Sequence, residues 1–282
     1  MRMKTLLCMS LLVMTSLWGC GNKEVVNFSE SYAVDDIAAI NIDNDSWQIK
    51  IMPSTDEEVR ISLDGKSTKK PRVGMQDGVL NISIDGQNGD GVSQFAMGKE
   101  GELTVYIPGG LDVPVTVKND SGDMKIDSLS VSGFMLDNSS GYVELNEVSL
   151  DMLEIFSESG DVKLDGGKAA DSKIRTSSGY VTIKNVEVKD ASITTKSGEV
   201  NAFGMGEETN IDVSTGSGDI GIAYGTEPEN LSFYIASGSE DVSMKCGGAS
   251  YIVDTVACKQ GTIGEGAYNL QINSDSGTVV VR

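Results

Sequence analysis

Residues 121–127 read SGDMKID, and close variants of this stretch return along the chain: SGYVELN at 140, SGDVKLD at 159, SGYVTIK at 178, SGEVNAF at 197 and SGDIGIA at 217. With the glycine of each variant as position zero, and with Gly238, Gly261 and Gly277 added, the spacing is 19 or 20 residues as far as Gly238, then 23 and 16. A fixed period near 20 indicates stacked structural units in place of one globular core.

Apolar residues keep a constant distance from this glycine. They fall two and four residues after it, as Met124 and Ile126 do, and five residues before it, as Val117 does. Alternation with a period of two is the pattern of a β-strand. Each unit therefore predicts two short strands and two turns. Units of this length predict an all-β fold, a parallel β-solenoid in which like residues stack from coil to coil.

The repeat also divides the chain. Regular SG coils cover residues 111–282, and a less regular set of strands covers residues 34–110, where NDSWQIKIM at 44 echoes NDSGDMKID at 119. The stretch QNGDGVSQFAMGKEG (87–101) is predicted to be a loop. We expect one continuous solenoid with an irregular N-terminal half, and a separate N-terminal β-domain is the alternative.

The polar residues of each unit also keep phase with the glycine. On outward positions the charges alternate from coil to coil, and so do Asp and Tyr, which predicts ladders of unlike neighbours about 4.8 Å apart. The charge ladder is Lys125, Glu144, Lys163 and Thr182, and the other is Asp123, Tyr142, Asp161 and Tyr180. Three residues before the glycine, on the inward phase, a column that is mostly polar predicts buried hydrogen bonding; it comprises Asn119, Asn138, Ser157, Thr176, Thr195, Thr215, Ile235, Cys258 and Ser274.

The SG step is expected to be a turn. Gly accepts a positive φ without penalty, and the preceding Ser can form hydrogen bonds with turn backbone. Nine copies of one glycine suit a scaffold better than a catalytic site, which needs a single constellation.

The N-terminus has the layout of a secretory signal peptide. Arg2 and Lys4 precede an apolar run from about residue 6 to residue 18 that is short for a membrane span. The sequence Leu17-Trp18-Gly19-Cys20 resembles the lipobox of bacterial lipoproteins, in which the cysteine receives lipid. We expect a signal peptide at 1–19 and a lipidated Cys20 followed by a linker to residue 33. An ordinary signal peptide or an uncleaved anchor is the alternative, and all three put the remaining chain outside the cytoplasm.

The chain is strongly acidic. Its formal net charge is −20, and cleavage before Cys20 leaves 20 basic and 42 acidic side chains. Such a charge disfavours nucleic acid, anionic lipid surfaces and uronate-rich polysaccharides as partners, since each needs a cationic footprint. The chain has no histidine, which removes the commonest metal ligand and general base.

Two cysteines, Cys246 and Cys258, remain for a disulfide in an oxidising compartment. The repeat puts them about one strand length, roughly 20 Å, apart. A disulfide requires Cα atoms within about 7 Å of each other. We therefore expect them not to be bonded.

No motif for catalysis stands out. Gly65-Lys66-Ser67 looks like the end of a phosphate-binding loop, but Arg60 stands where that loop needs glycine. There is no GxSxG elbow, and the glycine-rich nonapeptide of calcium-binding β-rolls is missing. We expect no catalytic, cofactor-binding or metal-binding residues.

Coils of the form ΦxΦxxSSGxΦxΦ after a lipobox, as in ITTKSGEVNAF and IRTSSGYVTIK, resemble the β-strand-repeat family of bacterial envelope lipoproteins named "putative adhesin". The resemblance covers residues 113–282 well and residues 28–111 loosely. It implies a β-solenoid on the outside of the cell, with no catalytic residues to carry over.

These observations favour a lipid-anchored, non-enzymatic cell-envelope module with a structural or adhesin-like role, which binds an envelope protein or a glycan along its faces. The alternatives are a regulatory component of envelope-stress signalling and, less favoured, a polysaccharide-active β-helix enzyme, for which two carboxylates would suffice. The chain ends in TVVVR, which reads as an apolar strand at an open solenoid end. Exposed strand edges invite pairing, so weak end-to-end self-association is expected.

Overall fold

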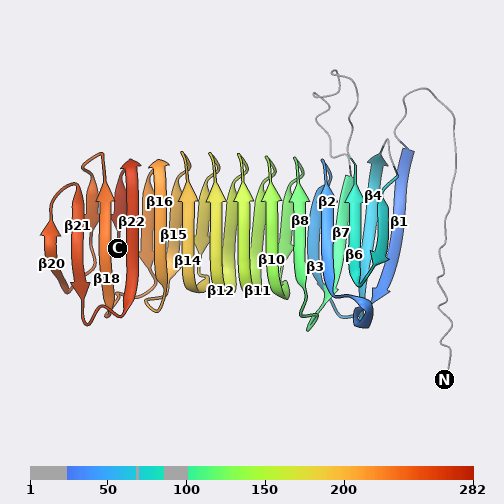
Figure 1. Cartoon of the computed structure of the whole chain (residues 1–282), viewed down its shortest axis with the longest axis horizontal. Coiled ribbons are helices and arrows are strands. Elements are labelled where there is room, and N and C mark those ends of the chain that lie inside the picture. Colours follow the sequence, from blue (N-terminus) through green and yellow to red (C-terminus); the bar gives the residue numbers. More distant parts are fainter. Residues whose placement is uncertain (1–23, 68–69, 86–100) are drawn as a thin grey trace, which may run out of the picture.

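The protein is an elongated all-β solenoid (Figure 1). The computed structural model describes residues 24–67, 70–85 and 101–282. These contain 23 strands and one 3-10 turn, η1 (Val34–Asp36). Among these residues, no helix is long and apolar enough to cross a membrane. The predicted signal peptide, Cys20 and the predicted loop up to residue 100 lie outside the described residues.

The middle of the molecule is the parallel stack that the repeat predicts. Its strands are β8 (Pro114–Asn119), β9 (Met124–Asp127), β10 (Ser130–Asn138), β11 (Val143–Ser157), β12 (Val162–Thr176), β13 (Val181–Lys184), β14 (Glu187–Thr195), β15 (Val200–Met205), β16 (Asn210–Ser217) and β17 (Ile220–Tyr224). They pair in parallel and in register, so that Val143 lies beside Val162. β11 and β12 run round most of a coil without a break, where the sequence predicts two strands.

Each central coil has three sides. In the coil of β11, the first side is residues 143–146, a short side is residues 147–151, and a long side is residues 152–157; the other coils follow in register. The burial pattern alternates along each side, and the exposed pair Asp151 and Met152 marks the bend between the short and long sides. This alternation puts one residue in two into a shared core.

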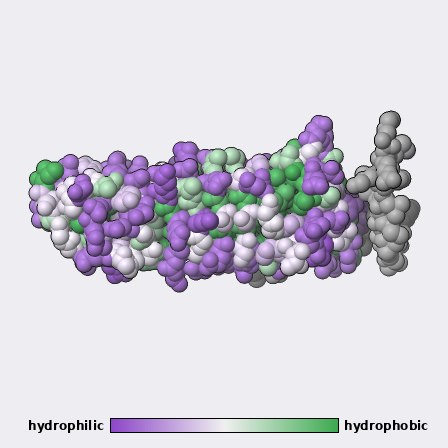
Figure 2. Space-filling view, turned by 90° about the horizontal axis from the view of Figure 1, so that it is seen from below, coloured by the Kyte–Doolittle hydropathy of each residue, from purple (hydrophilic) through white to green (hydrophobic). Residues whose placement is uncertain are grey.

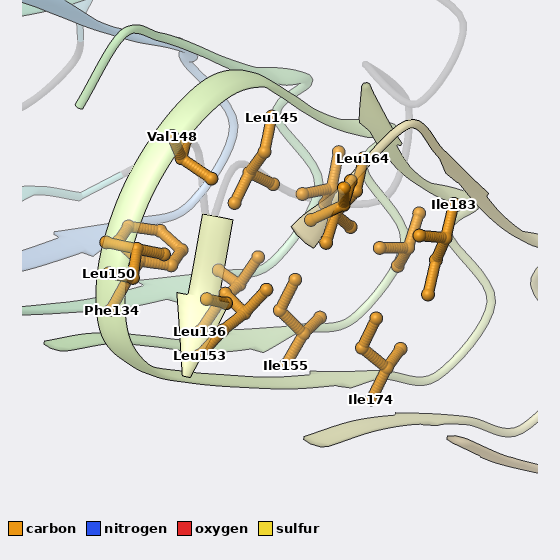
Figure 3. Packing of buried hydrophobic residues seen from close by; sticks show 14 of the residues in the cluster. Phe134, Leu136, Leu145, Val148, Leu150, Leu153, Ile155, Leu164, Ile174 and Ile183 are labelled. Carbon is orange, nitrogen blue, oxygen red and sulfur yellow. The ribbon is translucent and has the colours of Figure 1, made fainter. Parts of the chain in front are cut away.

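The core is a set of stacked columns of aliphatic side chains. Figure 3 shows two of them, Leu145, Leu164 and Ile183 from the first side and Leu136, Ile155 and Ile174 from the long side. All six side chains are buried. Identical phase in every coil, which the sequence predicts, therefore produces a continuous core along the whole axis.

The glycines of the SG step, called corner glycines below, are required by close packing between coils. The expectation that they adopt a positive φ is wrong for the corners from Gly122 to Gly218. A Cβ atom on Gly160 would lie 2.1 Å from the carbonyl oxygen of Gly141, and one on Gly179 would lie 2.1 Å from that of Gly160. Both distances are far shorter than van der Waals contact, so only a hydrogen atom fits there.

A buried polar ladder runs beside the corners, as the sequence predicts. Nδ2 of Asn44 donates to Oδ1 of Asn119 at 2.7 Å, and Nδ2 of Asn119 donates to Oδ1 of Asn138 at 2.7 Å. Asn119 also donates to the carbonyl oxygen of Gly122 at 2.6 Å. The ladder continues through Ser157, Thr176, Thr195, Thr215 and Ser274, all of them buried. The echo of residue 119 at residue 44 is thus a true structural equivalence.

The N-terminal end is built from β1 (Glu24–Ala33), β2 (Ala39–Asn44), β3 (Gln48–Ser54), β4 (Glu58–Ser67), β5 (Arg72–Gln76), β6 (Val79–Ile84) and β7 (Gly101–Pro108). β2 and β3 form a regular coil, inserted in parallel between β8 and β6 on the long side and between β9 and β7 on the first side. The outer strands are antiparallel, in the orders β1–β4–β7 and β5–β6. Residues 24–33, expected to be a linker, form the edge strand β1 instead.

The C-terminal end comprises β18 (Leu231–Ser237), β19 (Val242–Met244), β20 (Ala249–Asp254), β21 (Cys258–Ile263), β22 (Tyr268–Ser276) and β23 (Val279–Val281). β22 pairs with both β16 and β18, and β23 with both β17 and β19. TVVVR is therefore not at an open end, because it belongs to an interior coil in which Val279 and Val281 are fully buried. The end of the stack is the antiparallel series β18–β21–β20.

The repeat alignment is also wrong at two positions near this end. Gly261 lies inside β21, opposite Phe233 and Tyr251, and Val256, predicted to point inward, is 63% exposed. In the coil of β18, Ser237 pairs with Ser274 and takes the place in the polar ladder expected for Ile235. The alignment assumed that the parallel register continues to the end of the chain, whereas β21 pairs antiparallel with β18 and β20.

Cys246 and Cys258 are both free thiols, as predicted. Cys246 is buried beyond the end of β19, and Cys258 begins β21 beside Ala236. Burial and, to a smaller extent, Glu227 raise the pKa of the Cys246 thiol.

Candidate functional site

A groove runs along the short side of the central coils, with a volume of about 870 Å³. It extends across coils from Gly110 to Thr209. Figure 2 looks onto this side and shows apolar residues along the middle of the face, between hydrophilic margins. The groove lies parallel to the solenoid axis, so a ligand that fills it must be extended.

One column of aliphatic residues lines the floor of the groove. Val131, Leu150, Ala169 and Val188 stand in register on neighbouring coils, and all four are buried. They are the inward residues of the short side. Their outward neighbours on the same strands line the groove as well.

The walls carry charges of both signs. Asp151, Lys168, Glu187 and Lys189 are exposed and line the groove. None of the four takes part in an ion pair with another described residue. The walls therefore present acidic and basic groups that an incoming chain can pair with.

A second column of residues has a left-handed backbone conformation, and two of its members, Asn185 and Gly204, line the groove. Ser128, Glu147, Gly166, Asn185 and Gly204 occupy the same place in successive coils, and their φ angles are all positive, from 51° at Glu147 to 73° at Gly166. This left-handed conformation turns the chain from the first side into the short side. Sequence reasoning missed this corner because residues of four types occupy it. The available signal was their constant interval along the chain, which matches that of the corner glycines.

The Asp and Tyr ladder predicted from the sequence lies along the first side, next to the corner glycines. Oδ1 of Asp123 accepts a hydrogen bond from the backbone N–H of Tyr142 at 3.0 Å, and Oδ1 of Asp161 accepts one from that of Tyr180 at 2.9 Å. The alternation of Asp and Tyr thus has a structural cause, because each Asp supplies the acceptor for the next coil.

The neighbouring charge ladder is formed in part, because Lys125 pairs with Asp127 of its own strand at 3.3 Å and only Glu144 and Lys163 pair across coils. Nζ of Lys163 donates to Oε1 of Glu144 at 2.8 Å, and this hydrogen bond raises the pKa of Lys163. Burial, followed by the charge of Glu144, raises the pKa of the Tyr142 phenol. Tyr142 is therefore neutral and Lys163 charged at neutral pH.

The structure also locates other residues that the sequence singled out. Gly65, Lys66 and Ser67 end strand β4 and pair with β1, so they form no phosphate-binding loop. In the described part of the chain, no group of three or more His, Cys, Asp or Glu residues is placed to hold a metal ion. Cys20, the predicted lipid attachment site, lies outside this part.

Several solved structures are similar to this chain. A "putative adhesin" from Bacteroides fragilis is 17% identical over 91% of this chain and 97% of its own, with a TM-score of 0.46. A "putative adhesin" from Parabacteroides merdae is 16% identical over 94% and 98%, with a TM-score of 0.43. A "putative lipid binding protein" from Parabacteroides distasonis is 13% identical over 94% and 98%, with a TM-score of 0.43.

No curated protein matches the chain. A family model described as Toastrack DUF4097 matches residues 37–282, which is almost all of the solenoid. The matched residues include the SG coils and the irregular N-terminal strands from β2 onward. The chain belongs to the Toastrack DUF4097 family.

Proposed function

We propose that the protein is a lipid-anchored, non-enzymatic interaction module of the bacterial cell envelope, and that its short-side groove holds an extended segment of a partner protein. The observation that carries this proposal is the groove itself, which is lined by a column of aliphatic residues and by charges of both signs that form no ion pair with another described residue. A polypeptide supplies apolar, acidic and basic side chains together, which this lining requires.

The hydrogen bonds and ion pairs of the outward carboxylates support a non-enzymatic role. Asp123 and Asp161 accept backbone N–H groups, Glu144 pairs with Lys163, and Glu154 pairs with Lys173 at 3.5 Å. Carboxylates committed to such bonds hold coils together. They are poorly suited to the general acid and base work of a polysaccharide-cleaving enzyme.

The proposed lipid on Cys20 would hold the N-terminal end of the solenoid near the membrane. Only residues 21–23 separate Cys20 from β1, a reach of about 14 Å at most. The described strands of the long side, from β5 to β20, span about 58 Å at about 4.8 Å per strand. The tether therefore leaves the groove and the C-terminal end free to extend away from the lipid.

The anchor is tested by replacing Cys20 with Ala in the producing bacterium. We expect the wild-type chain to incorporate labelled palmitate and to sediment with membranes, and Cys20→Ala to do neither. Palmitate incorporation by Cys20→Ala would contradict the anchor and leave the groove proposal untouched.

The groove is tested with a photo-crosslinking amino acid at Ser149 in intact cells. We expect crosslinks to a distinct envelope protein from Ser149, and none from Thr194, an exposed residue on the long side. Ala170→Trp, which adds a large ring at the groove wall, should abolish the Ser149 crosslinks, whereas Thr194→Trp should not. Equal crosslinking from both sites, or no crosslinks from Ser149, would refute the groove as the binding site.

A further inference from the structure

A second surface, separate from the groove, presents two exposed aromatic rings. Tyr142 and Tyr180 are 41% and 56% exposed and occupy the same outward column of the first side. The register of Val143, Val162 and Val181 places them two coils apart, about 10 Å along the axis. Two phenol rings so placed on a rigid stack form paired platforms.

The acids that alternate with these rings are fixed in position. Asp123 and Asp161 each use Oδ1 to accept the backbone N–H of the following Tyr. Their Oδ2 atoms make no hydrogen bond with the described residues. Each carboxylate is therefore held by the fold and still has an oxygen available to accept a hydrogen bond from a ligand.

The adjacent column adds further polar groups at the same height. Lys163 and Glu144 are paired at 2.8 Å, and Thr182 follows Lys163 in register on the next coil. The surface beside the two rings thus offers ammonium and hydroxyl donors together with carboxylate acceptors. Glu144, Lys163 and Thr182 lie on strands β11, β12 and β13, and each ring and each Asp of the neighbouring column directly precedes such a strand.

This arrangement suits a sugar chain. A sugar ring in its extended, equatorial form has an apolar face, which packs on a Tyr ring, and a rim of hydroxyls, which donate to carboxylates. The separation of the rings is comparable to the repeat of an extended β-1,4-linked disaccharide. The local excess of carboxylates and the net charge of −20 disfavour an anionic chain.

We propose that Tyr142 and Tyr180, with the carboxylates of Asp123 and Asp161, bind a neutral, extended β-1,4-linked glycan that lies along the solenoid axis. Alternate sugar rings pack on the two phenols, and the sugar hydroxyls donate to the carboxylates beside them. This surface and its glycan ligand differ from the groove and its polypeptide partner, so a negative result for one site leaves the other proposal unchanged.

The test measures binding of chitohexaose and cellohexaose to the full mature chain by titration calorimetry. We expect weak binding that becomes about tenfold weaker in Tyr142→Ala and in Tyr180→Ala, and undetectable in the double variant. Tyr180→Phe should retain most of the affinity, because it keeps the ring. Tyr234→Ala, which removes a comparably exposed Tyr from the long side, should bind as the wild type does.

A displaced variant tests the spacing. Tyr180→Ala/Glu199→Tyr moves the second ring one coil further on, and it should bind no better than Tyr180→Ala. A hyaluronan hexasaccharide, which carries carboxylates, should not bind. The proposal is overturned if neither neutral hexasaccharide binds the wild type, if the Tyr→Ala variants bind like the wild type, or if hyaluronan binds equally well.

Discussion

The centre and the two ends of the solenoid are built from similar coils, but the coils follow one another along the axis in a different order. In the centre, neighbours in space are consecutive coils of the chain, and all strands are parallel. Toward the ends, β2 pairs with β8 and β16 with β22, strands that lie far apart in the chain, and the outermost strands are antiparallel. A parallel stack presents the same edge at every coil and has no intrinsic stopping point. In this chain the stack ends at both sides in strands that run the other way.

The largest effect is expected from deleting residues 268–282. This deletion removes the interior coil of β22 and β23, so β16 and β17 lose their parallel partners and the β18–β21 end loses its support. We expect the C-terminal third to become sensitive to protease and the urea unfolding transition to lose its single step.

The matched control deletes residues 162–180, one regular coil of similar length. The flanking coils can then stack directly in register, since Val143 and Val181 occupy equivalent positions beside Val162. Unfolding should remain cooperative at a modestly lower midpoint. Equal damage from both deletions would show that the terminal coil has no special place.

The next effect tests close packing at the corners. Gly160→Ala places a Cβ atom 2.1 Å from a backbone oxygen and should destabilise the protein by about 3 kcal/mol in urea unfolding. Gly133→Ala has its nearest such contact at 3.8 Å and should change stability by less than about 1 kcal/mol. Similar values for the two variants would remove steric stacking as the reason for the repeated glycine.

A smaller effect on stability is expected from replacing buried polar side chains, and it should depend on whether the side chain is hydrogen-bonded. Asn119→Ala removes the hydrogen bonds to Asn44 and Asn138 and leaves these two buried side chains without their partner in the ladder. It should lower the free energy of unfolding by about 2 kcal/mol. The buried Ser172 hydroxyl has no hydrogen-bond partner among the described residues, so Ser172→Ala should be neutral or stabilising by about 1 kcal/mol. Destabilisation by Ser172→Ala of more than about 1 kcal/mol would mean that the hydroxyl is satisfied in solution.

The smallest effect concerns the outward charge ladder. Because its hydrogen bond to Glu144 raises the pKa of Lys163, that pair stabilises the fold fully below the ordinary Lys pKa of 10.5 and loses this contribution as the pH rises through the raised value. Lys163→Met should therefore be slightly less stable than the wild type at pH 7 in urea unfolding, and this difference should shrink as the pH rises above 10.5. A difference that does not change with pH would assign the effect to packing of the Lys stem.

The sequence predicted the central fold because its signals are local and repeated. A period of two along each strand, a glycine at a constant interval and an inward polar column specify the coil, its core and its register. The insertion of β2–β3 and β22–β23 could not be read in this way, because a strand's own sequence does not say which of several equivalent edges it joins. Gly261 shows the limit, since it matches the repeat and yet lies in an antiparallel strand.

Of the two candidate surfaces, one could be predicted from the sequence and the other could not. The Asp and Tyr ladder was visible as an alternation from coil to coil, and the structure added the backbone hydrogen bonds that explain it. The groove was not visible, because it depends on how short the second side is and on a turn with no fixed residue type. Both properties appear only once the coil has closed.

The position of β22 and β23 also sets the order in which the fold can be completed. Residues 231–263 precede residues 268–281 in the chain, yet the later segment must lie between the earlier strands and the central stack. The C-terminal end therefore cannot be assembled coil by coil as the chain emerges, and β18 and β19 wait for the last residues. A chain that stops before residue 268 has nearly all of the repeats but lacks the coil that joins β18 and β19 to the central stack.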